Sequence, residues 1–148
     1  LARSTLGEKT VGSRVNLEPS LTANTPIGGH LVQGHVDGLG TIERVQRGDD
    51  WRITIAAEPD VIDLAAPKGS ICIDGVSLTV AAVAEKHFEV AIIPTTLEMT
   101  TLADVREGDR VNLETDMIAR TVVHYLKRQQ QPGGGVTMQT LAEHGFLG

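Results

Sequence analysis

The chain has 148 residues, a typical length for one domain that buries its own hydrophobic core. Its formal net charge of −6, without a cluster of Lys and Arg, argues against nucleic acid as a partner, because phosphate binding needs gathered positive charge. No apolar stretch approaches the roughly 20 residues that span a bilayer, and the N-terminus carries no signal-peptide pattern, so we expect a cytoplasmic protein without a membrane partner.

Cys72 is the only cysteine, which excludes a disulfide bond within the chain. It lies between Ile71 and Ile73, and this setting predicts a small packed side chain and not a nucleophile. Only 3% of the residues are aromatic, which is too few to predict stacking platforms for nucleic-acid bases.

The first segment of the chain is repeated later. Residues 1–18 align without a gap with residues 97–114, at an offset of 96 positions, and nine of the eighteen aligned pairs are identical. Both copies end in V-N-L-E. The repeat predicts a module of about 96 residues that occurs twice, so we expect this chain to hold one complete copy and the tail of an earlier copy, as a piece of a longer protein.

A change in composition predicts where the parts of the chain meet. Residues 22–29 combine small polar residues with Pro26 and paired glycines, a pattern typical of a linker or turn. We expect a tail of a truncated first module, a complete second module, a helix, and a linker with a short tail, at residues 1–25, 26–115, 116–131 and 132–148.

Short strands are expected in the complete module. Residues 30–42 mix apolar residues with glycines, which is typical of a strand with bulges, and residues 51–57 alternate as a strand does. Residues 58–64 predict one or two helical turns, and residues 88–93 and 110–113 predict two more strands. Short strands between turn signals favour a closed barrel or a sandwich.

Residues 68–80, K-G-S-I-C-I-D-G-V-S-L-T-V, are the most informative stretch. Their apolar alternation changes phase at Asp74 and Gly75, a pair that strongly favours a turn. The expected ribbon then presents Ser77 and Thr79 on the face opposite the apolar residues around them. On this stretch alone, ordinary polar residues on the wet face of a hairpin are the simpler interpretation.

From Thr115 onward the spacing of the apolar residues changes. Ile118, Val122 and Leu126 recur every four residues, which predicts an amphipathic helix whose start Thr115 or Asp116 caps. The apolar stripe of this helix needs a partner surface, either on the barrel or on another subunit.

Few residues indicate chemistry by themselves. His30 and His35 are five positions apart and fall on opposite faces of a strand, so metal binding is disfavoured and His30 is interpreted as an exposed polar residue. His35 is flanked by glycines, which allow a ligand or another backbone to come close. Residues 92–96, I-I-P-T-T, predict a strand that stops at a proline and then offers hydroxyls, although a plain strand end is the simpler interpretation.

Taken together, these motifs resemble the riboflavin synthase family. The resemblance rests on both copies of V-N-L-E, on G-G-H-x-V-Q-G-H-V-D-G at residues 28–38, on residues 68–80, and on I-I-P-T-T-L-E-M-T-T-L at residues 92–102. It runs from residue 1 to about residue 126. The resemblance implies an all-β fold, a closed six-stranded Greek-key-like β-barrel followed by a C-terminal α-helix.

The resemblance also implies an activity. Members of this family convert two molecules of 6,7-dimethyl-8-ribityllumazine into riboflavin and 5-amino-6-(ribitylamino)uracil by moving a four-carbon unit between them. They use no metal and no organic cofactor. They are trimers of tandem barrels, and the family places the helix that corresponds to residues 116–128 at the trimer interface, so we expect a homotrimer.

The site residues that the resemblance implies fall into two groups. His35, Asp74, Ser77 and Asp116 are the candidates for transferring protons or for orienting the groups that do so. The expected ligand contacts are Gly34, His35, Val36, Lys68, Ser77, Leu78, Thr79, Ile92, Ile93, Pro94, Thr95, Thr96 and Leu97.

This chain departs from the family in one respect. The opening M-F-T-G-I-V segment and the first copy of the G-V-x-L-T-V strand are absent, and in the family the first barrel of one subunit completes the site on the second barrel of another. We therefore expect ligand binding with weak or no synthase activity. The alternatives are a non-catalytic lumazine-binding or flavin-binding protein and a structural trimerisation module.

Overall fold

The structure is a computed structural model that describes residues 4–18, 32–129, 138, 141 and 144. It divides the chain into two units, residues 1–116 with all the described strands and residues 117–148 with the last helix. His30, the expected boundary at residues 22–29 and most of the expected tail at residues 132–148 lie outside the described residues.

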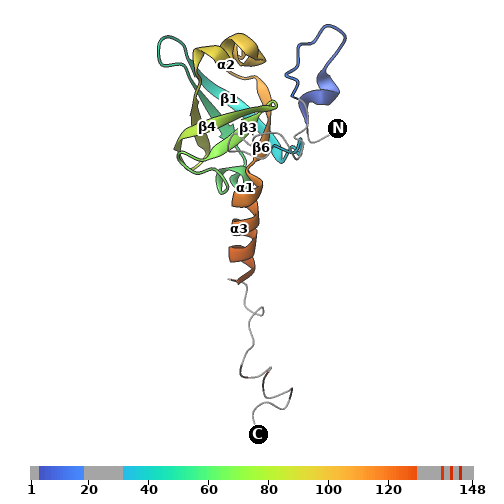
Figure 1. The fold of residues 1–148 in the computed structure, drawn as a ribbon, viewed down its shortest axis with the longest axis vertical. Helices are drawn as coiled ribbons and strands as arrows, with labels where there is room; N and C mark the ends of the chain where they lie inside the picture. The colour runs from blue at the N-terminus through green and yellow to red at the C-terminus, as the bar shows by residue number, and fades with distance from the viewer. Residues whose placement is uncertain (1–3, 19–31, 130–137, 139–140, 142–143, 145–148) are drawn as a thin grey trace, which may run out of the picture. The chain divides into compact units, whose positions relative to one another are not determined.

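Six strands close into a barrel in the order β1-β2-β5-β4-β3-β6, and every neighbouring pair is antiparallel (Figure 1). The expected closed six-stranded barrel is thereby confirmed. The chain passes from β2 to β3 and from β5 to β6 without pairing them, as in a Greek key. The strands are β1 (Gly38–Gln46), β2 (Arg52–Ala57), β3 (Ser70–Ile73), β4 (Val76–Val83), β5 (His87–Ala91) and β6 (Arg110–Thr115).

Alternate residues of the strands fill the interior of the barrel, because side chains on a strand point to opposite faces in turn. Phe88 is the one aromatic side chain among those that are fully buried, and β-branched and leucine side chains supply most of the remaining volume. The fully buried strand residues are Ile42, Ile53, Ile55, Ile71, Ile73, Val80, Phe88, Val90, Val111 and Leu113.

Short helices cover both ends of the barrel. Helix α1 (Pro59–Ile62) follows β2, and helix α2 (Pro94–Met99) follows β5. Because β2 and β5 run antiparallel, the two helices lie at opposite ends (Figure 1). Two 3₁₀ helices, η1 (Thr5–Glu8) and η2 (Thr101–Asp104), belong to the two copies of the sequence repeat.

Two expected strands were too long. Strand β1 begins at Gly38, because backbone N–H groups of the preceding segment bond to side chains instead of to a strand: Gln33 N and Gly34 N both donate to the Glu114 carboxylate. The strand expected at residues 88–93 ends at Ala91, two residues earlier than predicted. The hydroxyl-bearing residues after the proline belong to helix α2, where the fixed φ of Pro94 suits the first turn.

Helix α3 (Met117–Gln129) confirms the helix expected after Thr115. Its apolar side chains at Ile118, Val122, Tyr125 and Leu126 are between 51% and 63% exposed. Among the residues that the structure describes, no helix is both long and apolar enough to cross a lipid bilayer.

A close approach between strands predicts a sharp effect of one substitution. A Cβ atom on Gly40 would lie 2.5 Å from Ile55 Cγ2 and 2.8 Å from Leu113 Cδ1, inside the packed core. We expect Gly40→Ala to lower the free energy of unfolding by about 1–3 kcal/mol, measured by urea denaturation. Thr41→Ala, at the exposed next position, is the matched control, and equal stability of the two variants would contradict the prediction.

Candidate functional site

The β3–β4 ribbon turns where the sequence predicted. Asp74 and Gly75 form its two-residue turn with φ of 45° and 83°, and Ile73 pairs with Val76 on either side. Positive φ at both central residues is the geometry that Asp-Gly favours in hairpins. The orientation is also confirmed, because Ser77 and Thr79 are exposed. Leu78 and Val80, which alternate with them, are buried in the barrel.

A network around Asp74 fixes this turn. Asn112 donates to Asp74 Oδ1 from its backbone N at 2.8 Å and from Nδ2 at 2.6 Å, while Asp74 N donates to the Asn112 carbonyl at 2.9 Å. From the other side, Asn16 Nδ2 donates to the Asp74 carbonyl at 2.8 Å. Asp74 therefore orients the turn through its carboxylate and its backbone together.

Lys68 closes the other end of the ribbon. Its backbone N donates to the Val80 carbonyl at 2.8 Å, and Val80 N donates back to the Gly69 carbonyl at 2.9 Å. Lys68 has a φ of 66°, and its side chain is exposed. Lys68, Ser77 and Thr79 thus belong to one short ribbon with an accessible outer face.

The segment after β5 lies beside this ribbon. Val80 of β4 pairs with Val90 of β5, and continuing this antiparallel register sets Leu78 opposite Ile92. Ile92 is buried, whereas Ile93 is 65% exposed. The fold therefore brings together two of the predicted ligand segments, residues 77–79 and residues 92–97.

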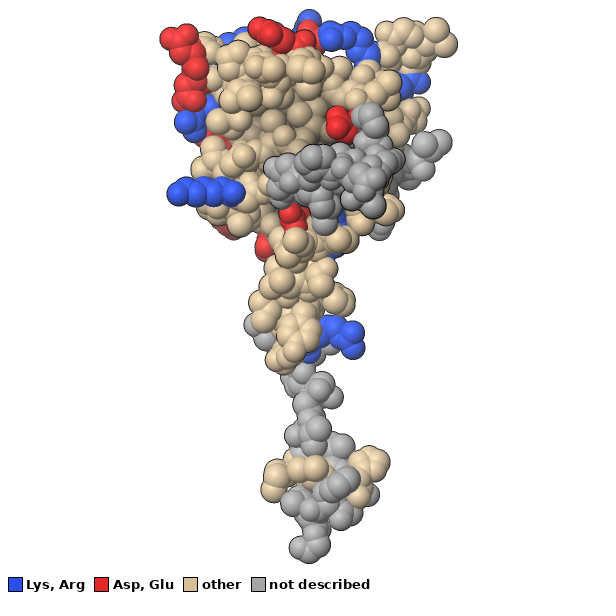
Figure 2. Space-filling model, in the orientation of Figure 1, with Lys and Arg blue, Asp and Glu red and all other residues tan. Residues whose placement is uncertain are grey.

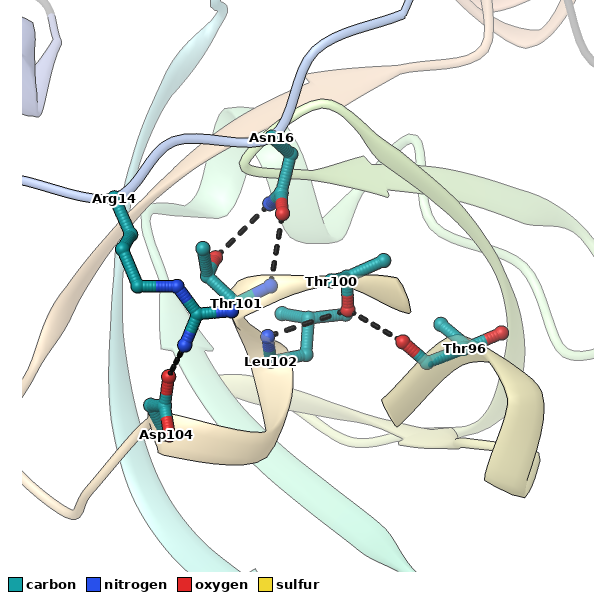
Figure 3. Close-up of polar contacts among 7 residues, drawn as sticks. All are labelled: Arg14, Asn16, Thr96, Thr100, Thr101, Leu102 and Asp104. Carbon is teal, nitrogen blue, oxygen red and sulfur yellow. Dashed lines mark hydrogen bonds and ion pairs between the residues drawn. The ribbon is translucent and has the colours of Figure 1, made fainter. Parts of the chain in front are cut away.

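Helix α2 gives the second of these segments a fixed shape. The Ile93 carbonyl accepts from Thr96 N at 3.0 Å and from Leu97 N at 3.3 Å. Thr100 Oγ1 donates to the Thr96 carbonyl at 2.6 Å (Figure 3). Pro94 and Thr95 are exposed at the start of the helix. The predicted contacts from Pro94 to Leu97 are consequently presented by a helix and not by a strand end.

His35 belongs to a different part of the barrel surface. Gln33 N and Gly34 N donate to the Glu114 carboxylate at 2.7 Å and 3.0 Å, and His35 and Gly34 are exposed. Glu114 pairs with Cys72 and Cys72 pairs with Ser77, so two strand spacings, about 10 Å, separate the backbones of Glu114 and Ser77.

Asp116 is likewise remote from the Asp74 turn. Thr115 pairs with Ile71, whereas Asp74 follows the opposite end of β3. Asp37 Oδ2 holds this end of β6 by accepting from Thr115 N at 2.8 Å and from Thr115 Oγ1 at 2.7 Å. The four predicted catalytic residues are therefore spread along the barrel and do not form one cluster.

A pocket of about 230 Å³ lies between the N-terminal segment and the barrel. Gly34, Val36 and Asp74 are the only predicted site residues among those that line it. The pocket is thus distinct from the outer face of the ribbon.

Figure 2 shows acidic and basic side chains interspersed over the visible face of the barrel, with uncharged surface between them.

Sequence reasoning missed the roles of three polar residues. Asn16, Asn112 and Glu114 hold the turn and the segment before β1, and Glu114 is buried. The sequence feature that could have pointed to them is the repeated V-N-L-E motif, in which Asn16 aligns with Asn112. Among the described residues, no three side chains of His, Cys, Asp or Glu are grouped as metal ligands.

The barrel matches a known domain family. The lumazine binding domain family matches residues 33–116, a span that contains all six strands. Riboflavin synthase of Mycobacterium tuberculosis is 44% identical over 131 residues, which cover 86% of this chain and 65% of that protein. Riboflavin synthase of Actinobacillus pleuropneumoniae is 37% identical over 150 residues, covering 99% of this chain and 69% of that protein.

Solved structures agree with this match. The crystal structure of LumP complexed with riboflavin has a TM-score of 0.68 and 26% identity, covering 76% of this chain and 62% of that chain. LumP complexed with 6,7-dimethyl-8-(1'-D-ribityl) lumazine has a TM-score of 0.66 at 24% identity, a likeness of fold, over 76% of this chain and 60% of that chain. The chain contains a lumazine-binding β-barrel, and it belongs to the riboflavin synthase family.

The environment of Cys72 predicts its reactivity. Burial, followed by the nearby Glu114 carboxylate, raises the pKa of the Cys72 thiol to about 12. The raised pKa keeps the thiol neutral, so at pH 8 its thiolate fraction is about a thousandfold below that of an ordinary cysteine. We expect no labelling by Ellman's reagent at pH 8 in the folded chain and full labelling in guanidinium chloride. Rapid labelling of the folded chain would contradict this buried setting.

Proposed function

We propose that the chain provides a barrel of a riboflavin synthase, that this barrel binds 6,7-dimethyl-8-ribityllumazine on the outer face of the β3–β4 ribbon, and that turnover by this chain alone is weak. The observation that carries this proposal is the 37% identity to a riboflavin synthase across 99% of the chain. The chain spans 65% of the length of the Mycobacterium tuberculosis enzyme and 69% of that from Actinobacillus pleuropneumoniae.

The geometry of the ribbon supports a flat, hydroxyl-bearing ligand. Ser77 and Thr79 are exposed on one edge, and the half-buried Thr96 lies on the neighbouring segment. Their hydroxyls are suited to bond the ribityl chain or the oxygens of the ring. Ile93, which precedes Thr96 on the same segment, is exposed and offers an apolar surface on which the ring can rest.

The reaction requires positioning more than strong catalytic groups. One lumazine gives up a four-carbon unit and becomes 5-amino-6-(ribitylamino)uracil, while the other accepts the unit and becomes riboflavin. The atoms of two substrate molecules equal those of the two products, so no oxidant or reductant enters. Loss of a proton from the 7-methyl group gives a carbanion that the ring itself stabilises, and the protein holds two rings together and moves protons.

The spread of the candidate residues suggests how they divide this work. Ser77 bonds the ligand on its own barrel, and Asp74 orients the turn that leads to Ser77. His35 and Asp116 lie on other parts of the barrel, and we assign them to a ligand bound across a module or subunit boundary. This assignment explains why the four residues do not converge within one barrel.

The second candidate is a binding protein without turnover. The likeness to LumP complexed with riboflavin, at 26% identity, favours it. Incubation of the chain with 6,7-dimethyl-8-ribityllumazine separates the two candidates. Riboflavin absorbance establishes the synthase. Quenching of lumazine fluorescence without product establishes the binding protein. If neither riboflavin absorbance nor quenching is observed, the trimerisation module remains as the function.

Removing hydroxyls from the ribbon tests the location of the site. Ser77→Ala and Thr79→Val are each expected to weaken lumazine binding about fivefold, because each removes about 1 kcal/mol of hydrogen bonding. Fluorescence titration measures the dissociation constants. Thr41→Ala, an exposed hydroxyl variant on β1, is the control. Binding that is unaffected by both ribbon variants would move the ligand to another face.

We also propose that α3 joins three copies of the chain. The exposed apolar side chains of Ile118, Val122, Tyr125 and Leu126 support this role, because burying such a stripe in an interface is more favourable than exposing it to water. Light scattering is expected to give three times the 15.8 kDa mass of the chain.

Charged residues in the stripe test the trimer. Replacing both Ile118 and Leu126 with Lys is expected to reduce the measured mass to that of a single chain, since the interface would have to bury two charges. His124→Lys, also on an exposed position of α3, is the control and should keep the trimer. A single-chain mass for the unaltered protein would rule out this interface.

A further inference from the structure

The two copies of the sequence repeat bind each other in the same atomic pattern. Asn112 Oδ1 accepts from Thr5 N at 2.7 Å, and Asn112 Nδ2 donates to Thr5 Oγ1 at 2.8 Å. Asn16 Oδ1 accepts from Thr101 N at 2.8 Å, and Asn16 Nδ2 donates to Thr101 Oγ1 at 3.0 Å (Figure 3). Asn16 and Asn112 are counterparts in the repeat, as are Thr5 and Thr101.

The ion pairs repeat this exchange. Arg14 pairs with Asp104 at 2.5 Å, and Arg110 pairs with Glu8. Arg14 and Arg110 are counterparts, and Glu8 and Asp104 occupy matching positions. These side chains are exposed, so the pairs add little stability, but they show that the match extends beyond the two asparagines.

Such an exchange is the mark of a two-fold interface, in which each contact occurs twice with the partners reversed. The apolar residues of the two repeat copies differ in burial. Val111 and Leu113 are buried in the barrel, whereas their counterparts Val15 and Leu17 are 47% and 87% exposed. The repeat therefore aligns Val15 and Leu17 with Val111 and Leu113, the residues that fill the barrel core in the complete copy.

We propose that residues 5–18 and 101–114 form a two-fold clamp between successive copies of the lumazine-binding module, in which Asn16 of the earlier copy positions the Asp74 turn of the later copy. Asn112 holds the Asp74 carboxylate, and Asn16 holds the Asp74 carbonyl. Both residues of the turn have positive φ, so these contacts keep the turn in a conformation that few residues adopt.

The clamp links one module to the ligand site of the other. Ser77 follows the turn by two residues, so a shift of the turn moves the outward hydroxyls of the ribbon. This consequence rests on the proposed lumazine site, whereas the clamp itself rests on the contacts alone. Asn16 is thus a positioning residue that acts through the Asp74 turn.

Hydrogen exchange resolved to single amides tests the clamp without any ligand. Asn16→Ala removes the acceptor of the Thr101 amide and the donor to the Asp74 carbonyl, so exchange should rise at least tenfold at Thr101 and in the turn at residues 74–76. Asn112→Ala should raise exchange at Thr5 in the same way. Val11→Ser is the control in the same segment as Asn16, because Val11 is fully exposed.

Lumazine titration of the same variants tests the positioning role. Asn16→Ala is expected to weaken binding about three- to tenfold while its far-ultraviolet circular dichroism stays unchanged. Unchanged exchange at Thr101 in Asn16→Ala overturns the clamp, even if Asn112→Ala fails to fold. A loosened turn with unchanged lumazine affinity overturns the positioning role. Absence of binding by the unaltered chain refutes the proposed function instead, and the exchange pattern still decides the clamp.

Discussion

The carboxylate of Asp74 connects the parts of this fold that matter for its site. By accepting two N–H groups of Asn112, it ties the β3–β4 turn to β6 at the point where the barrel closes. Asn16 reaches the same turn from the N-terminal segment. The direction of β4, and with it the outward position of Ser77 and Thr79, depends on this junction.

Carboxylates serve the same purpose elsewhere on the barrel. Glu114 binds the backbone before β1, and Asp37 binds the end of β6. In each case an acidic side chain accepts from backbone N–H groups that have no partner on a neighbouring strand. Glu114 of the second V-N-L-E motif and Asp37 of the H-V-D-G motif thus have structural roles.

Much of the fold was predictable from local patterns. The phase change at Asp74 predicted both the turn and the faces of the residues that follow, because side-chain alternation is a property of any strand. The segment at residues 94–97 was not predictable in the same way. Two apolar residues before a proline suit a strand end and a helix start equally, and the chain forms the helix, whose first turn closes on the Ile93 carbonyl.

The sequence by itself determined the strands, their inward faces, the repeat and, through its motifs, the family. Only the tertiary structure decided which residues meet. It continued the β4–β5 register so that Leu78 lies opposite Ile92, kept Asp116 away from the Asp74 turn, and joined Asn16 to Thr101 across 85 positions. Alternation and turn signals act over a few neighbouring residues, whereas these pairings follow from barrel closure and from the two-fold exchange between the repeats.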